Sequence, residues 1–147
     1  MAHSYSRIHI HLVFSIKERR KLISKELQPL LWAYIAGICK NNEMIAVAIG
    51  ETEDHVHILF HLSPKLALAK AVQLIKGNSS KWIGEQGIEF AWQEGYGAFS
   101  VSSSNLDQVA GYIRNQEAHH RKFSFEEEFR ALLEKHGVEY DPKYVVG

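Results

Sequence analysis

Residues 54–62, DHVHILFHL, decide the fold because apolar and polar side chains alternate along them as they do on a β-strand. Every second position is apolar and forms the face expected to meet the core: Val56, Ile58, Phe60 and Leu62. The opposite face holds three histidines, His55, His57 and His61, together with Leu59. This strand predicts a sheet that buries one face in the core and presents imidazoles on the other.

Residues 6–16, SRIHIHLVFSI, form a second strand with the same division into two faces. One face is apolar throughout: Ile8, Ile10, Leu12, Phe14 and Ile16. The other face carries His9 and His11, followed by Val13 and Ser15. The chain therefore contains two His-x-His pairs, and each lies on the polar face of a strand.

Helix and strand signals fill the rest of the chain. The predicted elements are a helix from Ser24, strands at 44–50 and 54–62, a helix at 63–82, extended segments at 88–93 and 96–102, and helices at about 104–120 and 124–137. This order predicts an α+β fold: a ferredoxin-like (RRM-like) antiparallel sheet with helices on one face and additional C-terminal helices. We expect one domain over residues 1–147, with up to five histidines on an open face of the sheet.

Composition excludes several classes of protein. The 147 residues are 46% hydrophobic and 23% charged, which suits a packed core without extended disorder. A single cysteine, Cys39, rules out a disulfide framework and a cysteine-ligated metal site. The longest apolar run, LLWAYIAGIC, is too short to span a bilayer, so we expect a cytoplasmic protein with no membrane partner.

The net charge is zero, but the charges are unevenly distributed. Residues 1–125 hold 14 Lys and Arg against 11 Asp and Glu, whereas residues 126–147 hold 3 against 6. The densest basic segment, KERRK at 17–21, directly follows the first strand. A mildly basic body is compatible with a nucleic-acid partner but does not by itself predict one.

The His-x-His pairs are candidate metal ligands because side chains at i and i+2 of a strand point the same way. With 9 histidines in 147 residues, such a pair arises by chance about 0.5 times per chain, so neither copy identifies a site alone. The predicted helix at 104–120 adds Tyr112 and Gln116, which lie on one helical face. A phenol can act as a nucleophile and an amide oxygen suits Mg²⁺ or Mn²⁺, although spacing alone favours a half-buried packing role for Tyr112.

The combination of HVHILFHL at 55–62 with GYIRNQEAHHRKF at 111–123 resembles the single-tyrosine HUH transposases, an IS200-like family that includes the REP-associated tyrosine transposases. Three further segments are similar to that family: HLVFSIKERRKLI at 11–23, WQEGYGAFSVS at 92–102 and FEEEFRALLEKHGVEYDPKYV at 125–145. The resemblance implies that His55 and His57 bind the metal, that Tyr112 is the nucleophile and that Gln116 is the third metal ligand.

The same resemblance implies a metal-dependent enzyme that nicks and rejoins single-stranded DNA through a 5′-phosphotyrosine and recognises hairpin ends. The implied cofactor is Mg²⁺ or Mn²⁺, and the implied assembly is a homodimer with active sites shared in trans. Basic residues are expected to contact the DNA backbone: Lys17, Arg19, Arg20, Lys21, Arg114, Arg121 and Lys122.

Three alternatives stay open. The chain could be a domesticated REP-associated transposase that acts on genomic repeats, or a non-catalytic ferredoxin-like module that binds nucleic acid and uses its histidines structurally. It could also be a metal hydrolase that uses water, and such an enzyme would leave no tyrosine adduct on its DNA.

Overall fold

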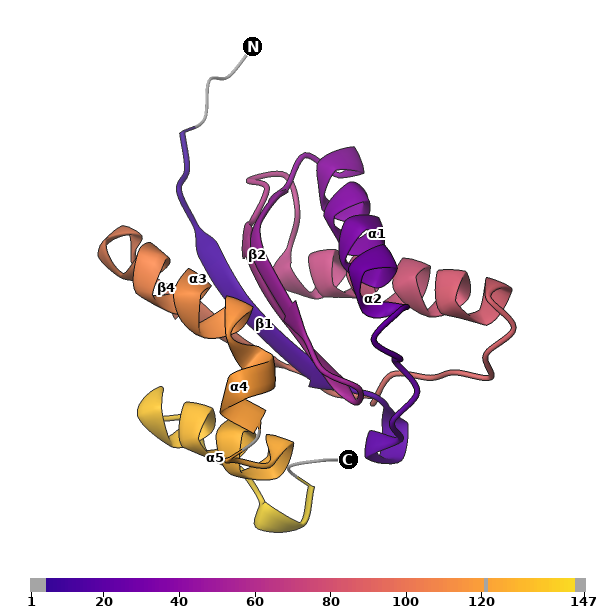
Figure 1. Cartoon of the computed structure of the whole chain (residues 1–147). Helices are drawn as coiled ribbons and strands as arrows, with labels where there is room; N and C mark the ends of the chain where they lie inside the picture. Colours follow the sequence, from indigo (N-terminus) through magenta and orange to yellow (C-terminus); the bar gives the residue numbers. More distant parts are fainter. Residues whose placement is uncertain (1–4, 121, 145–147) are drawn as a thin grey trace.

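The computed structural model describes residues 5–120 and 122–144. Four antiparallel strands form one sheet in the order β2-β3-β1-β4 (Figure 1). Their bounds are β1 His9–Ser15, β2 Ile45–Glu51, β3 His55–His61 and β4 Gly97–Val101. The two histidine strands are therefore adjacent at the centre of the sheet, as the ferredoxin-like pattern predicts. No helix in the described ranges is long and apolar enough to cross a membrane.

Helices α1 (Gln28–Asn41) and α2 (Leu68–Glu85) cover one face of the sheet, and Figure 1 shows both on the same side. The apolar faces of β1 and β3 pack against them in the main hydrophobic core, in which Leu12, Phe14 and Ile58 are fully buried. This arrangement confirms the prediction that the apolar face of each of the two strands meets the core.

The histidine face is also covered, so the expectation of an open face is wrong. Helices α3 (Leu106–Arg114), α4 (Gln116–His120) and α5 (Phe125–Lys135) lie on that side of the sheet (Figure 1). The physical reason is that apolar residues are interspersed among the histidines. Val13 packs against α5 in one small cluster, and Leu59 packs against α3 in another.

Two predicted helices begin later than their first polar signals suggest. The Ser24 hydroxyl accepts a hydrogen bond from Leu27, but it closes a turn that precedes α1. Ser63 closes a similar turn five residues before α2 begins. The extended segment at 88–93 forms only an isolated bridge, between Trp92 and Ile16, and not a strand.

The predicted helix at 104–120 is broken. A short 3₁₀ turn at Ser103–Asn105 leads into α3, and Asn115, with φ −100° and ψ 24°, separates α3 from α4. Tyr112 therefore lies at the end of one helix and Gln116 at the start of the next. Two other 3₁₀ turns occur in the described ranges, at Lys17–Arg19 and Pro142–Tyr144.

The last long helix begins and ends as its sequence predicts. Ser124 and Glu127 form a capping box, in which each side chain bonds to the backbone N–H of the other residue. Gly137 follows the helix with a φ of +66°, a conformation that glycine adopts without strain. This helix is important because it delivers Glu128 to the histidine face.

Candidate metal and nucleophile site

His55 and His57 lie on β3 under the C-terminal helices, and neither is exposed to solvent. The register pairs His57 with Val13 and pairs Leu59 with His11 on β1. Burial of two imidazoles requires hydrogen-bond partners, because an unpaired buried polar group costs free energy. Both histidines have such partners, and these partners fix their orientation.

His57 is held from both sides. Its Nδ1 lies 2.8 Å from Nε2 of His11, and its Nε2 lies 2.8 Å from Oε1 of Glu128 on α5. The pKa of His11 is lowered to about 3, mainly by burial and secondly by the neighbouring His57, so His11 is neutral. A neutral imidazole can donate or accept at Nε2, so His11 can accept the Nδ1 proton of His57 when Nε2 of His57, which points at Glu128, serves as a ligand.

His55 is oriented in the same way by the turn that precedes β3. Its Nδ1 lies 2.7 Å from Asp54 Oδ1 and 2.7 Å from Thr52 Oγ1. Burial lowers the pKa of His55, but its hydrogen bonds to the Asp54 and Glu128 carboxylates, together with their negative charges, outweigh burial, so the pKa lies above its ordinary value. Because the Asp54 carboxylate only accepts hydrogen bonds, Nδ1 carries a proton and Nε2 points into the site.

Gln116 is buried beside the histidine pair. Its Oε1 lies 3.4 Å from His55 Nε2, and its Nε2 donates to the carbonyl oxygen of Tyr112 at 3.4 Å. The amide nitrogen is therefore occupied by the backbone at the break between α3 and α4. This orientation leaves the amide oxygen facing the imidazoles.

Tyr112 is half-buried at the end of α3, with its ring centroid 5.9 Å from that of His57. The Tyr112 hydroxyl donates a hydrogen bond to Oε2 of Glu128. Burial and the Glu128 carboxylate together raise the pKa of Tyr112 above its ordinary value, so this group is held as a neutral phenol. The same chain supplies both the tyrosine and the histidines in this arrangement.

Glu128 is the residue that sequence reasoning missed. It is 4% exposed, and its two oxygens face different groups: Oε1 faces His55 at 3.5 Å and His57 at 2.8 Å, while Oε2 faces Tyr112 and also His119 at 3.3 Å. A signal was present, because Glu128 lies three residues after Phe125, on the buried stripe of α5. A carboxylate on such a stripe requires a polar partner.

The donor atoms fit a divalent cation. His55, His57 and Glu128 each offer one atom, and these atoms lie within 4.8 Å of one another. The separations between neighbouring donors, Gln116 included, are 2.8–3.5 Å. Adjacent ligands of an octahedral Mg²⁺ ion lie about 3 Å apart, because each is about 2.1 Å from the metal. The mixed nitrogen and oxygen donors also suit Mn²⁺.

Gly50 on β2 allows α3 to approach the sheet. It pairs with His57 in the register, and a Cβ atom at this position would lie 1.8 Å from the carbonyl oxygen of Ile113. Any other residue would push the end of α3 away from the sheet. Gly50 therefore fixes how closely Tyr112 and Gln116 approach the histidine strand.

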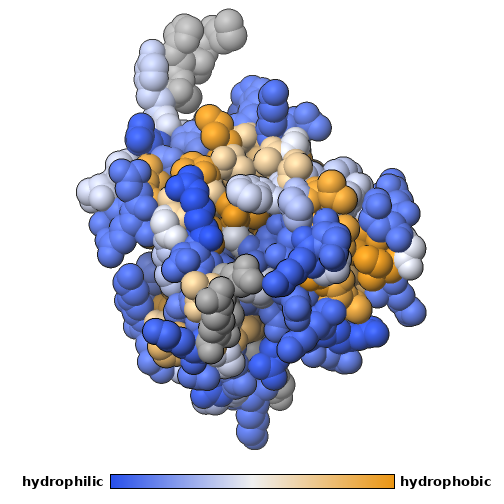
Figure 2. Space-filling model, in the orientation of Figure 1, coloured by the Kyte–Doolittle hydropathy of each residue, from blue (hydrophilic) through white to orange (hydrophobic). Residues whose placement is uncertain are grey.

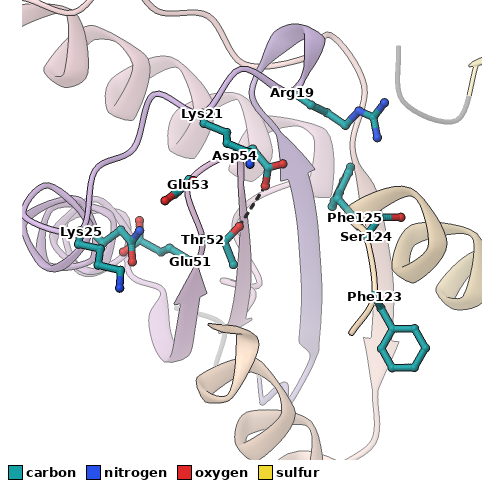
Figure 3. A pocket seen from close by; sticks show the side chains of 11 residues that line it. Arg19, Lys21, Lys25, Glu51, Thr52, Glu53, Asp54, Phe123, Ser124 and Phe125 are labelled. Atoms are coloured by element: carbon teal, nitrogen blue, oxygen red, sulfur yellow. Dashed lines mark hydrogen bonds between the residues drawn. The ribbon is translucent and has the colours of Figure 1, made fainter. Parts of the chain in front are cut away.

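The predicted DNA-contact residues do not form one cluster. Arg19 and Lys21 line a pocket of about 430 Å³ that reaches Asp54 and Phe125 beside the metal-ligand candidates (Figure 3). Lys17 and Arg20 line a different pocket, with residues 89–91.

Two of the remaining predicted contacts lie on or between the helices that cover the histidine face. Arg114 donates to the carbonyl of Val47 at 3.2 Å and lines a pocket that includes Gln116. Lys122 is exposed between α4 and α5. Arg121 and the side chain of His120 lie outside the part of the chain that the structure describes.

Comparison with known proteins identifies a family whose sequence pattern this chain matches. Residues 4–116 match the family model described as "Transposase IS200 like". The transposase for insertion sequence element IS200 from Salmonella typhimurium is 25% identical over 124 residues, which cover 79% of this chain and 81% of that protein. The ISDra2 transposase TnpA from Deinococcus radiodurans is 24% identical over 123 residues, which cover 75% of this chain and 84% of that protein.

Two solved structures have a similar fold. A crystal structure described as a transposase from Deinococcus radiodurans R1 has a TM-score of 0.62 and 23% identity, covering 79% of this chain and 96% of that one. A REP-associated tyrosine transposase bound to a REP hairpin also has a TM-score of 0.62, with 14% identity, covering 82% of this chain and 73% of that one. The ferredoxin-like α+β prediction is confirmed by these matches.

Proposed function

This chain belongs to the family of IS200-like transposases, and from that membership we propose that it nicks and rejoins single-stranded DNA with Tyr112 as its nucleophile. The observation that carries the proposal is the convergence of Tyr112, His55 and His57 on one buried carboxylate, Glu128. Phosphoryl transfer requires a nucleophile and an electrophilic activator within a few ångströms of each other.

We propose that His55 and His57 hold a divalent ion, Mg²⁺ or Mn²⁺, with Gln116 as the third ligand. Glu128 is a further candidate ligand through Oε1, and it would add a negative charge that a purely neutral ligand set lacks. When bound, the ion would polarise the scissile phosphate and neutralise charge that develops in the transition state. His11 and Asp54 would keep the two imidazoles in the ligand tautomer.

Tyr112 supplies the covalent step. Its oxygen attacks phosphorus, the bond from phosphorus to the 3′ oxygen breaks, and the products are a 5′-phosphotyrosine and a free 3′-hydroxyl. The Tyr112 proton passes to Oε2 of Glu128, which already accepts a hydrogen bond from it, and the departing 3′ oxygen takes a proton from solvent to become the hydroxyl. A second 3′-hydroxyl then attacks the adduct and restores the phenol, so the exchange of strands needs no external energy source.

The substrate class is single-stranded DNA with hairpin ends. Support for a hairpin comes from the structurally similar REP-associated tyrosine transposase, which is bound to a REP hairpin. A domesticated copy acting on genomic repeats would use the same chemistry. The position of the gene separates the two cases, because a mobile copy lies between hairpin-bearing ends.

We also propose a homodimer, because joining two DNA ends with one tyrosine per chain requires two chains. The family resemblance further predicts that the tyrosine helix of one subunit docks on the histidine pair of the other. Mixing His57→Ala chains with Tyr112→Phe chains tests this prediction, since exchange in trans restores some cleavage. If the subunits are confirmed to exchange and no cleavage returns, the trans arrangement is wrong. Each chain would then use its own tyrosine and histidines, as they lie together in the single chain.

The proposal is tested with 3′-labelled hairpin strands taken from the DNA that flanks the gene, incubated with the protein and Mg²⁺ or Mn²⁺. We expect a protein-linked DNA band that survives denaturation in the wild-type chain and is lost in Tyr112→Phe. Tyr96→Phe is the matched control, because Tyr96 is exposed and lies outside the site. DNA binding without an adduct would favour the non-catalytic module, and cleavage without an adduct would favour a hydrolase that uses water.

A further inference from the structure

Two pockets lie beside the metal-ligand candidates and share two lining residues. The larger, of about 430 Å³, reaches Thr52, Asp54 and Phe125, whose side chains contact His55. The smaller, of about 250 Å³, is lined by Gln116 itself. Both are lined by Gln28 and Glu51, so they form adjacent parts of one groove. The two volumes are in or near the range of sites that bind small molecules.

Each pocket carries one large aromatic side chain that is exposed. Phe123, 46% exposed, lies at the larger pocket, and Trp32, 47% exposed, lies at the smaller. The core does not explain this exposure, since burying either ring would be favourable. Exposed aromatic rings beside a polar groove are the platforms on which unpaired nucleobases stack.

Cations surround the same groove. Arg19, Lys21 and Lys25 line the larger pocket from the segment between β1 and α1, as Figure 3 shows, and Arg114 lines the smaller one. Glu51, Glu53 and Asp54 also line the larger pocket, but Asp54 is hydrogen-bonded to Thr52 and His55. These cations can contact backbone phosphates along a strand that crosses the site.

Two further features distinguish this groove from an ordinary surface hollow. Oε2 of Glu51 is buried with no hydrogen-bond partner among the residues that the structure describes. Glu18 and Arg19 have φ values of 61° and 52°, which non-glycine residues adopt only at a cost. Such strain collects at functional sites, and here it lies in the loop that presents Arg19 to the pocket.

From this geometry we propose that the two pockets form a track for unpaired nucleotides of single-stranded DNA on both sides of the scissile phosphate, with one base stacked on Phe123 and another on Trp32. Arg19 and Arg114 contact phosphates of the same strand, and Glu51 lies at the wall that the two pockets share. The track rests on the proposed nickase function, because it assigns the neighbouring nucleotides of the strand that Tyr112 would attack.

The test is binding of a fluorescein-labelled 12-mer of oligothymidylate to full-length chains that carry Tyr112→Phe, in Mg²⁺, so that no strand is cut. Replacing either Phe123 or Trp32 by alanine is expected to weaken binding about 5- to 100-fold, which corresponds to one lost base stack. Tyr34→Ala is the matched control. Tyr34 is 38% exposed on α1 and stacks on Trp82, much as Phe123 stacks on His119, but Tyr34 lines neither pocket, so its loss should change binding less than twofold.

A second measurement locates the bases directly. A 12-mer that contains 5-iododeoxyuridine is crosslinked by light, and the modified peptides are identified by mass spectrometry. We expect crosslinks at Phe123 and Trp32. The track is overturned if either alanine variant binds as the parent does, if Tyr34→Ala weakens binding equally, or if crosslinks fall on other aromatic residues.

These outcomes are separable from failure of the proposed function. Unchanged binding in the Phe123 and Trp32 variants, with a covalent adduct still formed by the wild-type chain, would remove the track and leave the nickase. Weakened binding in both variants, with no adduct in the wild-type chain, would leave a single-strand-binding module and remove the nickase.

Discussion

Gly50→Ala tests the docking of α3 on the sheet. The added Cβ would lie 1.8 Å from the carbonyl oxygen of Ile113, 2.8 Å from its carbonyl carbon and 3.1 Å from Cγ of Gln116. Non-bonded heavy atoms make favourable contact at about 3.5–4.0 Å, so the end of α3 must move away by more than about 1 Å. A backbone carbonyl cannot avoid the clash by a change of rotamer.

The expected magnitude follows from that displacement. Overpacking a well-packed interface costs about 1–3 kcal/mol in the free energy of unfolding. The same shift carries Tyr112 and Gln116 away from the histidine strand, and a misplacement of about 1 Å can cost roughly 10²-fold in the rate of the covalent step. The rate of adduct formation should therefore fall further than the loss of stability explains.

The assay combines urea unfolding with the rate of adduct formation on hairpin DNA. Gly37→Ala is the matched control, because Gly37 lies inside α1 with no atom within 4 Å of a Cβ. That substitution should stabilise the chain by about 0.5–1 kcal/mol and leave the rate unchanged. If Gly50→Ala is as stable and as active as the wild-type chain, α3 does not dock on β2 as described.

Three further predictions concern the groups around the site. His11→Ala should weaken Mn²⁺ binding about 10- to 100-fold in calorimetry, because His57 loses the partner that fixes its tautomer, and unchanged affinity would refute this role. Burial raises the pKa of Glu51 from an ordinary 4.5 to about 8, so the folded chain keeps a proton that the unfolded chain releases between those values. Stability should then fall as pH rises through this range, and Glu51→Gln should gain roughly 1–3 kcal/mol in urea unfolding at pH 8 but little at pH 5. EDTA should abolish adduct formation while the thermal unfolding midpoint stays nearly constant. The fold should survive because the buried site groups also bond to one another and because apolar clusters stabilise the chain. Unfolding of the protein by EDTA would instead show that the metal is structural.

The sheet was predictable because period-2 alternation is a strong signal on β1 and β3. The two strands fix the core face, and the order of elements then leaves few topologies. The covering of the histidine face was not predicted, because only Val13 and Leu59 mark it as a packing surface. Two apolar residues among five histidines give a weak pattern.

The break at Asn115 was also missed, because Asn is only a mild helix breaker and the flanking spacing stays helical. Its consequence is local: Gln116 begins a new helix, and its amide bonds back to Tyr112. The roles of Tyr112, His55, His57 and Gln116 stay predictions from the family resemblance, and the structure adds that these four residues lie together. Glu128 needed the fold, because nothing in its own segment indicates which group lies opposite it.

The measurement that tests the central claim most directly is peptide mapping of the denatured reaction product. The wild-type chain, incubated with hairpin DNA and Mg²⁺ and then digested with nuclease and protease, should yield one peptide that carries a nucleotide through a phosphodiester on Tyr112. A nucleotide on Tyr96 or on any other residue, or DNA cut with every peptide unmodified, would contradict the account.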